Sequence, residues 1–169
     1  MAGDVRLVPV DDKTLEPLLS VAAAEAEPDD VMPPVDAPAG WSHARREAFR
    51  EFHRASYDGL EGPTGTVMYA ILLGGEVVGM IRLARRPEPG VAETGMWLGR
   101  SFRGQGVGVA ALRELLTEAA GLGMRTVVAE TTPDNSGAIG VLTKCGATLS
   151  ATGDTVRAEI SLDLVPRER

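Results

Sequence analysis

The chain has 169 residues, of which 44% are hydrophobic and 24% charged, so it can form one globular domain with a substantial core. Its 24 Asp and Glu residues outnumber its 17 Lys and Arg residues and give a formal net charge of −7. This acidity argues against a nucleic-acid or anionic-membrane partner, because both attract basic patches, and it is compatible with a cationic partner.

Two elements are predicted before the first proline-rich stretch. Apolar and polar residues alternate over residues 5–10, which indicates a strand. Apolar residues then recur at helical spacing over residues 15–22. We therefore expect a helix that is capped near Asp11 and runs to about Glu25.

The stretch at residues 27–40 contains four prolines and is expected to interrupt helical structure. No Lys or Arg occurs between Lys13 and Arg45, whereas acidic residues accumulate at positions 25–36. This acidic loop (residues 25–36) is either a solvated connector or a loop beside a binding site that attracts a cation.

A second helix is expected over residues 43–56, with Ser42 as its N-cap. Its apolar face consists of Ala48, Phe49, Phe52 and Ala55. The aromatic residues of this face, together with Trp41 and Tyr57, could line a pocket or simply pack the helices.

Three consecutive strands follow and should pair in an antiparallel fashion. The first two, residues 66–73 and 76–83, are joined by Gly74-Gly75, a two-residue hairpin signal. A longer connection at residues 85–90 leads to the third strand at residues 93–98.

The segment Arg103-Gly104-Gln105-Gly106-Val107-Gly108 is a glycine-dense turn that opens a helical pattern. Glycines allow positive φ and a close approach of backbone N–H groups to a ligand, and the free N–H groups at a helix N-terminus favour an anion. The spacing is not G-x-G-x-x-G and no Lys follows Gly108, so neither a dinucleotide-binding loop nor a nucleotide P-loop is indicated. By itself the turn is either a phosphate cradle or a tight turn before a core helix.

The helix after the turn has one apolar face and ends at Gly121 and Gly123. The apolar face consists of Val109, Leu112, Leu115, Leu116, Ala119 and Ala120. Residues 126–131 are mostly apolar and β-branched, as in a buried central strand.

The last elements are a short helix and two strands. Residues 133–136 form a turn and a cap for a helix that ends near Gly146. Strands at residues 147–151 and 156–164 should close the chain around a turn at Gly153-Asp154.

The predicted order is β-α-α-β-β-β-α-β-α-β-β, in a single domain over residues 1–169. The strand–helix–strand unit at residues 93–131 should be a right-handed crossover. The expected fold class is therefore α/β (α+β), with a mixed, mostly antiparallel central sheet, a β-α-β crossover and helices on both faces.

Cysteine and histidine are too scarce for a disulfide or a metal cluster. Cys145 is the only cysteine, which excludes an intrachain disulfide and a thiolate zinc cluster and fits a reducing cytoplasm. It has no obvious His partner, so a covalent role is not expected. His43 and His53 lie ten residues apart in a polar region and are better explained as surface or helix-packing residues than as metal ligands. There is no apolar signal core, and no run approaches 18 apolar residues.

Three segments carry a family resemblance. Arg103–Gly108 match the signature Gln/Arg-x-x-Gly-x-Gly/Ala, and Glu93–Leu98 resemble the fourth strand that precedes it. Asn135–Ala138 and Val141–Gly146 resemble the segment Asn-x-x-Ser/Ala … Glu-Lys-x-Gly-Phe, except that Ala147 replaces the usual Phe. With the element order, this pattern resembles the GNAT superfamily of acyl-CoA N-acyltransferases, and most closely its branch that acts on the N-termini of ribosomal proteins.

The resemblance implies that acetyl-CoA binds as a cosubstrate where the fourth and fifth strands splay apart. It implies that the pyrophosphate is held by backbone N–H groups of Arg103, Gly104, Gln105, Gly106, Val107 and Gly108. Backbone groups of Trp97 and Leu98 would pair with the pantetheine arm like an extra strand. Asn135 matches a position that commonly touches the pantetheine.

The resemblance also indicates catalytic candidates. At pH 7 only about one alkylamine in a thousand is unprotonated, so acetyl transfer to an amine requires removal of a proton. Family members carry a base or a water-relay carboxylate at the position of Glu93 or of Glu130, although either residue could instead bind an Arg or a backbone N–H. Leu142 stands where many members have a Tyr that protonates the CoA sulfur. Ser136 is a possible substitute donor, or only a helix cap.

The acceptor is expected to be cationic because of the acidic loop. It could be a polyamine, an aminoglycoside-like antibiotic, or a Lys or N-terminal amine of a protein. We thus expect a cytoplasmic, acetyl-CoA-dependent N-acetyltransferase that works by direct attack in a ternary complex, without a metal, and that can form a homodimer. The alternative, suggested by Leu142, is a non-catalytic acyl-CoA-binding regulatory module.

Overall fold

A computed structural model describes residues 3–162 of the chain as seven strands, five α-helices and two 3₁₀ helices. The strands are β1 (Val5–Pro9), β2 (Thr66–Leu73), β3 (Glu76–Arg85), β4 (Val91–Leu98), β5 (Thr126–Thr131), β6 (Thr148–Thr152) and β7 (Thr155–Ser161). The helices are α1 (Asp12–Glu25), α2 (Pro28–Val31), α3 (His43–Arg54), α4 (Val107–Gly121) and α5 (Ser136–Lys144), with the 3₁₀ helices η1 (Gly59–Glu61) and η2 (Arg100–Phe102).

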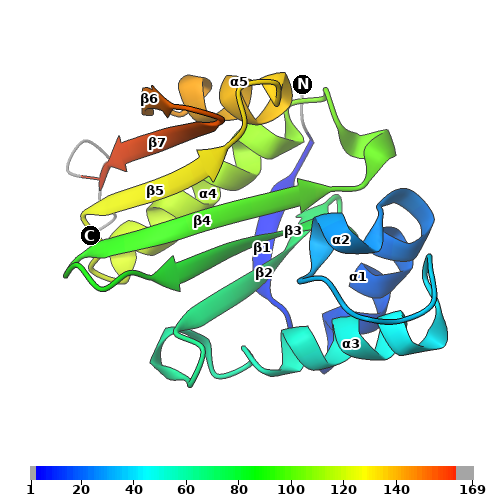
Figure 1. Cartoon of the computed structure of the whole chain (residues 1–169). Coiled ribbons are helices and arrows are strands. Elements are labelled where there is room, and N and C mark those ends of the chain that lie inside the picture. The colour runs from blue at the N-terminus through cyan, green and yellow to red at the C-terminus, as the bar shows by residue number, and fades with distance from the viewer. Residues whose placement is uncertain (1–2, 163–169) are drawn as a thin grey trace.

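The strands form one mixed sheet in the order β1-β2-β3-β4-β5-β7-β6 (Figure 1). Strands β1 to β4 pair antiparallel with one another in chain order. Strand β5 pairs parallel to β4, and α4 connects the two strands in the chain. Strand β7 lies between β5 and β6 and is antiparallel to both. The expected fold class is confirmed, as is the hairpin at Gly74-Gly75, where both glycines have positive φ.

Two predicted boundaries need correction. The prolines of residues 27–40 were expected to interrupt any helix, yet Pro28 is the first residue of α2. Proline is tolerated there because the first N–H of a helix has no intrahelical partner to lose. The last strand was expected to reach residue 164, but β7 ends at Ser161 and residues 163–164 lie outside the described residues.

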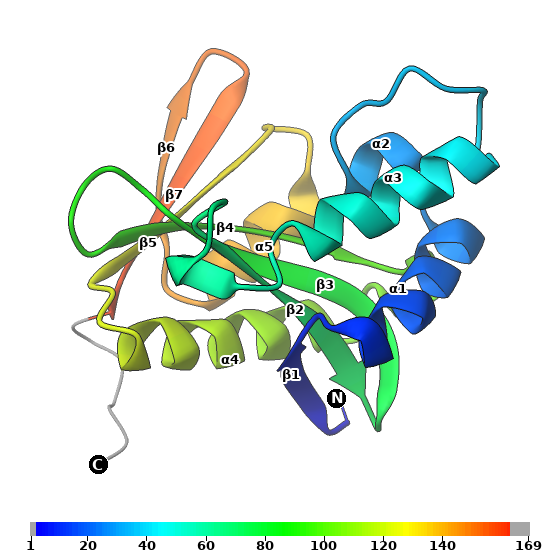
Figure 2. The same cartoon turned by 90° about the horizontal axis from the view of Figure 1, so that it is seen from below.

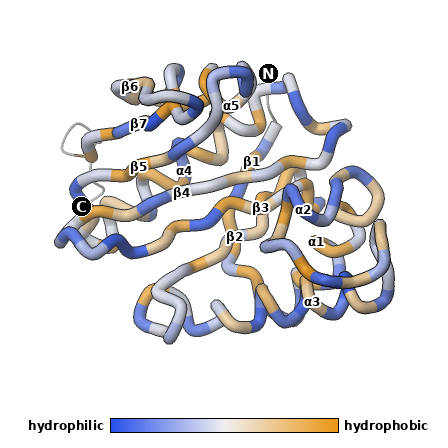
Figure 3. Tube along the Cα trace, in the orientation of Figure 1, coloured by the Kyte–Doolittle hydropathy of each residue, from blue (hydrophilic) through white to orange (hydrophobic). Residues whose placement is uncertain are grey.

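Helices cover both faces of the sheet (Figures 1 and 2). On one face, α1 and α3 pack in a cluster that includes Phe49 and Met80. On the other face, α4 and α5 pack in a cluster that includes Ile81 and Leu142. The hydropathy tube is mainly hydrophobic along β2 and β3, which both clusters sandwich (Figure 3).

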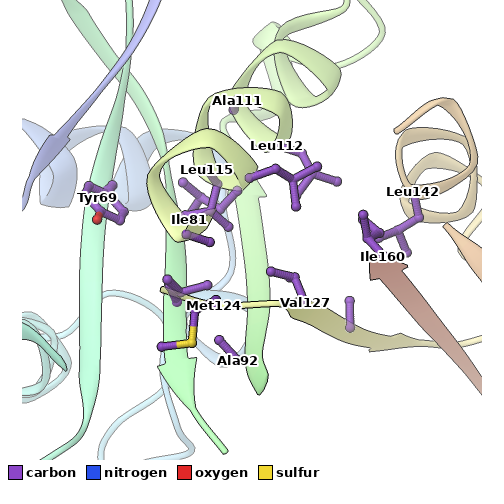
Figure 4. Packing of buried hydrophobic residues seen from close by; sticks show 14 of the residues in the cluster. Tyr69, Ile81, Ala92, Ala111, Leu112, Leu115, Met124, Val127, Leu142 and Ile160 are labelled. Carbon is purple, nitrogen blue, oxygen red and sulfur yellow. The ribbon is translucent and has the colours of Figure 1, made fainter. Parts of the chain in front are cut away.

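Helix α4 is held by the apolar face that its periodicity predicts. Ala111, Leu112 and Leu115 lie over Ile81 and Val127 of the sheet (Figure 4). All five side chains are at most 2% exposed, and burying each large one contributes about 1.5–3 kcal/mol. This packing fixes the N-terminus of α4, and hence the glycine turn, relative to β4.

Helix α1 begins at a capping box, and its last residue accepts a hydrogen bond from η2. Asp11 accepts hydrogen bonds from the N–H groups of Lys13 and Thr14, while Thr14 Oγ1 accepts one from Asp11 N. At the other end Glu25 Oε1 accepts a 2.6 Å hydrogen bond from Ser101 N, and this contact lowers the pKa of the Glu25 carboxyl. The last residue of α1 thereby supports η2, which precedes the glycine turn.

At Gly79 of β3 the backbone of β4 leaves no room for a side chain. A Cβ atom at this position would lie 2.2 Å from the carbonyl oxygen of Trp97 and 3.0 Å from Leu98 Cα. Backbone atoms cannot yield as the end of a side chain can, so glycine alone fits here.

His53 is fully buried in α3 between two aromatic rings. Its ring centroid lies 4.1 Å from that of Phe49 and 5.1 Å from that of Phe52. Its Nδ1 lies 2.8 Å from Phe49 O, which fits the tautomer with the proton on Nδ1. Burial lowers the pKa of His53 to about 4, against the opposing effect of the backbone hydrogen bond. His53 is thus a helix-packing residue.

We expect Gly79→Ala to lower the free energy of unfolding by about 3 kcal/mol, because the added methyl group meets the backbone of β4. Gly121→Ala is the matched control, since no atom lies within 4 Å of a Cβ there. It should change stability by less than about 1 kcal/mol. Urea unfolding followed by tryptophan fluorescence measures both, and equal stability of the two variants would contradict the close approach.

His53 should make stability depend on pH. Its pKa of about 4 lies below the ordinary 6.5, so the unfolded state binds more protons between these values. Stability is therefore complete above pH 6.5 and falls as the pH drops towards 4, by up to about 3 kcal/mol. Urea unfolding at several pH values should show a flatter dependence for His53→Leu than for the exposed control His43→Leu. Parallel curves would contradict this origin.

Candidate active site

Strands β4 and β5 separate after a short stretch of pairing. They pair only from Val91↔Thr126 to Glu93↔Val128. Beyond Glu93, β4 continues to Leu98 with β3 as its partner, whereas β5 pairs only with β7. The edge of β4 that faces β5 therefore carries no strand over residues 94–98 within the described chain, and Figure 1 shows the two strands diverging.

The glycine turn takes its shape from two residues in the left-handed backbone region. Gly104 has φ 74° and Gly106 has φ 82°, and Gly106 is the N-cap of α4. The backbone N–H groups from Gly104 to Val109 have no hydrogen-bond acceptor within residues 3–162. Because these donors gather at the N-terminus of a 15-residue helix, the turn is suited to hold an anion.

Two side chains of the turn bind the backbone that precedes it. Gln105 Nε2 donates a 2.7 Å hydrogen bond to Ser101 O, and Arg103 Nε donates a 3.3 Å hydrogen bond to Leu98 O. Gly108 is buried, and a Cβ atom there would lie 3.2 Å from Val141 Cγ2. The third glycine therefore serves close packing of α4 against α5, whereas the first two serve backbone conformation.

A cavity of about 850 Å³, here called the turn cavity, lies between the glycine turn, the free end of β4 and the start of α5. Its walls include these residues that the sequence predicts for the donor site: Trp97, Leu98, Arg103, Gly104, Gly106, Gly108 and Asn135. Ser136 also lines it, as does Lys144, which the sequence analysis did not single out. The Gln105 side chain instead binds Ser101, and Val107 is buried in the core.

A second cavity of about 600 Å³, here called the helix cavity, lies between α2, α3 and strands β2 to β4. Its walls include Phe52 and Arg82. The two cavities share Asp30, Met96 and Trp97, so they meet beside the end of β4. A molecule bound in the turn cavity and a molecule bound in the helix cavity could thus be in contact with each other.

The acidic loop contributes to the helix cavity. Asp29 and Asp30 of α2 both line it, which favours the alternative of a loop beside a binding site. The aromatic residues divide in their roles. Phe52 lines the cavity, Trp41 packs edge-on against Phe49 at 5.8 Å, and the exposed Tyr57 donates a 3.1 Å hydrogen bond to Asp12.

The two candidate glutamates lie on the α1–α3 face of the sheet but in different surroundings. Glu93 Oε1 accepts from Arg82 at 3.1 Å and its Oε2 accepts from Arg86 at 3.0 Å. Glu130 is exposed on β5 opposite Arg157. Neither glutamate lines the two cavities formed by the described residues. Their role as a base stays a prediction.

Leu142 and Cys145 face the protein interior. Leu142 is 5% exposed in the core cluster, beside Ile160 (Figure 4). Cys145 is half-buried, with Sγ 3.8 Å from Val109 O, and burial raises the pKa of its thiol. A raised pKa reduces the thiolate fraction and makes a nucleophilic role unfavourable.

Within residues 3–162, no three His, Cys, Asp or Glu side chains come close enough together to hold a metal ion. None of the helices in that range combines the length and the apolar character that crossing a bilayer requires.

The sequence matches the model of the Acetyltransferase (GNAT) family over residues 30–147. A search of curated proteins gives no significant match. The fold is similar to that of the ribosomal alpha-N-protein acetyltransferase RimL in complex with coenzyme A, with 21% identity, a TM-score of 0.74 and 94% of each chain covered.

Two other solved structures show the same likeness. RimJ of Mycobacterium smegmatis, in complex with CoA-disulfide, has 20% identity and a TM-score of 0.77 over 98% of this chain and 85% of its own. The Microcin C7 self immunity acetyltransferase MccE, in complex with acetyl-CoA and AMP, has 16% identity and a TM-score of 0.73 over 94% and 92%. At these identities the similarity shows a shared fold.

Proposed function

Because the chain belongs to the GNAT family of acetyltransferases, we propose that it transfers the acetyl group of acetyl-CoA to a primary amine. The acceptor would be a cationic small molecule or an amine of a protein or peptide, attacked directly in a ternary complex. The observation that carries this proposal is the meeting of two cavities at Met96 and Trp97, one with an anion-binding turn and the other with acidic walls.

Acetyl-CoA suits the turn cavity in charge and shape. The N–H groups of residues 104–109 would bind the pyrophosphate, and Lys144 and Arg103 add positive charge to the same walls. The edge of β4 over residues 94–98 offers backbone groups to the amides of the pantetheine arm, as an added strand would. Asn135 Oδ1 accepts from Ala138 N as the N-cap of α5, which places its amide at the cavity wall.

The acceptor amine would enter through the helix cavity. Asp29 and Asp30 supply negative charge, while the positive charge of Arg82 is balanced by Glu93. A cation is therefore favoured there over an anion. Ser136, which lines the turn cavity, is the proposed donor of a proton to the departing CoA thiolate. Glu93 and Glu130 are proposed as base or water relay on the sequence argument alone.

We expect Gly106→Ala to raise the dissociation constant of acetyl-CoA at least about tenfold. An alanine in the left-handed region costs about 1–2 kcal/mol, and relief of this strain would turn the N–H groups away from the cavity. Gly123→Ala is the matched control at the opposite end of α4, since Gly123 has φ 89° and no atom within 4 Å of a Cβ.

Isothermal titration calorimetry with acetyl-CoA measures both variants, with circular dichroism to check the fold. Both should lose similar stability, but only Gly106→Ala should lose affinity. Equal acetyl-CoA affinity in the two variants would contradict the assignment of the turn to the pyrophosphate.

The proposed activity is tested by release of CoA, detected with DTNB, against a panel of polyamines, aminoglycosides and peptides with free N-termini. Cationic amines should be acetylated in preference to neutral or anionic ones, because of Asp29 and Asp30. Tight binding of acetyl-CoA without turnover of any acceptor would instead identify a non-catalytic acyl-CoA-binding module.

A further inference from the structure

Asp30 lines both the helix cavity and the turn cavity. No other ionisable residue within residues 3–162 lines both. Asp29 and Arg82 line the helix cavity alone, and Arg103 and Lys144 line the turn cavity alone. Asp30 therefore stands where the contents of the two cavities come into contact.

The backbone holds Asp30 firmly at this junction. Its own N–H donates to Glu27 O at 3.0 Å, and Met32 N donates to Pro28 O at 3.2 Å, which closes the single turn of α2. Pro28, Val31 and Met32 are buried, and the latter two belong to the α1–α3 core cluster. Because these buried residues hold the two ends of α2, its exposed residues Asp29 and Asp30 face the helix cavity, and Asp30 alone of the two also lines the turn cavity.

The carboxylate of Asp30 is also free to accept a hydrogen bond. No donor within residues 3–162 contacts its oxygens, whereas both oxygens of Glu93 are engaged by arginines. The one buried imidazole nearby, His53, is fully enclosed and already bonded to Phe49 O. Of these groups, only Asp30 has both access to the junction and unused acceptor capacity.

We propose that Asp30 is the catalytic base of the acetyl transfer, which leaves Glu93 and Glu130 only the part of a water relay; this assignment rests on the proposed function. The acceptor enters as an ammonium ion, which pairs with Asp30 and gives it one proton, directly or through one water molecule. The neutral nitrogen then attacks the acyl carbon, the C–N bond forms, and the C–S bond breaks with its electron pair going to sulfur. Ser136 gives its hydroxyl proton to the thiolate and regains a proton from the second N–H of the new amide nitrogen, and the exposed Asp30 releases its proton to solvent.

The test is steady-state kinetics of Asp30→Asn with the best acceptor of the wild-type protein. Asparagine keeps the shape and the hydrogen-bond acceptor of aspartate but takes up no proton. We expect kcat to fall at least about 100-fold while the dissociation constant of acetyl-CoA, from calorimetry, stays within about twofold. Asp30→Glu should recover a measurable part of kcat because it restores the carboxylate.

Two matched variants distinguish the loss of a catalytic base from the loss of a negative charge elsewhere on the protein. Asp29→Asn, in the helix cavity alone, should raise the KM of the amine far more than it lowers kcat. Asp154→Asn removes the same charge from the exposed β6–β7 turn and should leave both parameters near wild type.

The outcomes that overturn the proposal are distinct. The proposal is wrong if Asp30→Asn keeps a kcat within about threefold of wild type. It is also wrong if the 100-fold fall in kcat occurs only in Glu93→Gln or Glu130→Gln, which would identify that glutamate as the base. A wild-type protein that binds acetyl-CoA yet acetylates no amine would overturn the proposed function together with this assignment.

Discussion

The site depends on the limited pairing between β4 and β5. Three residue pairs join them, and beyond Glu93↔Val128 each strand follows its other neighbour. A backbone edge without a partner is costly to bury but useful where an extended ligand can complete it. β3 secures the opposite edge of β4 as far as Leu98, and Gly79 lets the two backbones meet there. The pairing of β4 with β3 thus fixes the position of the β4 edge that has no partner strand.

The glycine turn and the two cavities follow from this divergence. β4 leads through η2 into the turn, and α4 then crosses back to β5, buried on the sheet by its apolar face. The free N–H groups of the turn come to lie beside the open edge of β4. On the other face, α2 lies near the same strand end and brings Asp30 to Met96 and Trp97. The turn cavity and the helix cavity therefore share the end of one strand, β4.

Much of the fold could be predicted from local pattern, and the donor wall from motif. Periodicity predicted β2, β5 and the buried face of α4, because side-chain burial follows backbone period. α2 was missed because Pro28 was interpreted as a helix breaker. Asp30 was not singled out because only tertiary packing brings it to β4, although the absence of Lys and Arg between Lys13 and Arg45 was a signal.

The hydrogen bond between Glu25 and Ser101 has a thermodynamic consequence. It joins the end of α1, which carries the chain into α2, to η2 immediately before the glycine turn. A ligand that orders the turn would, through this hydrogen bond, also restrain the segment that leads into α2, and less conformational entropy would then be lost when a second ligand binds beside α2. By linkage, a ligand of the turn cavity and a ligand of the helix cavity would change each other's affinity by the same factor. One partly buried carboxylate thus connects a wall of the turn cavity to a wall of the helix cavity.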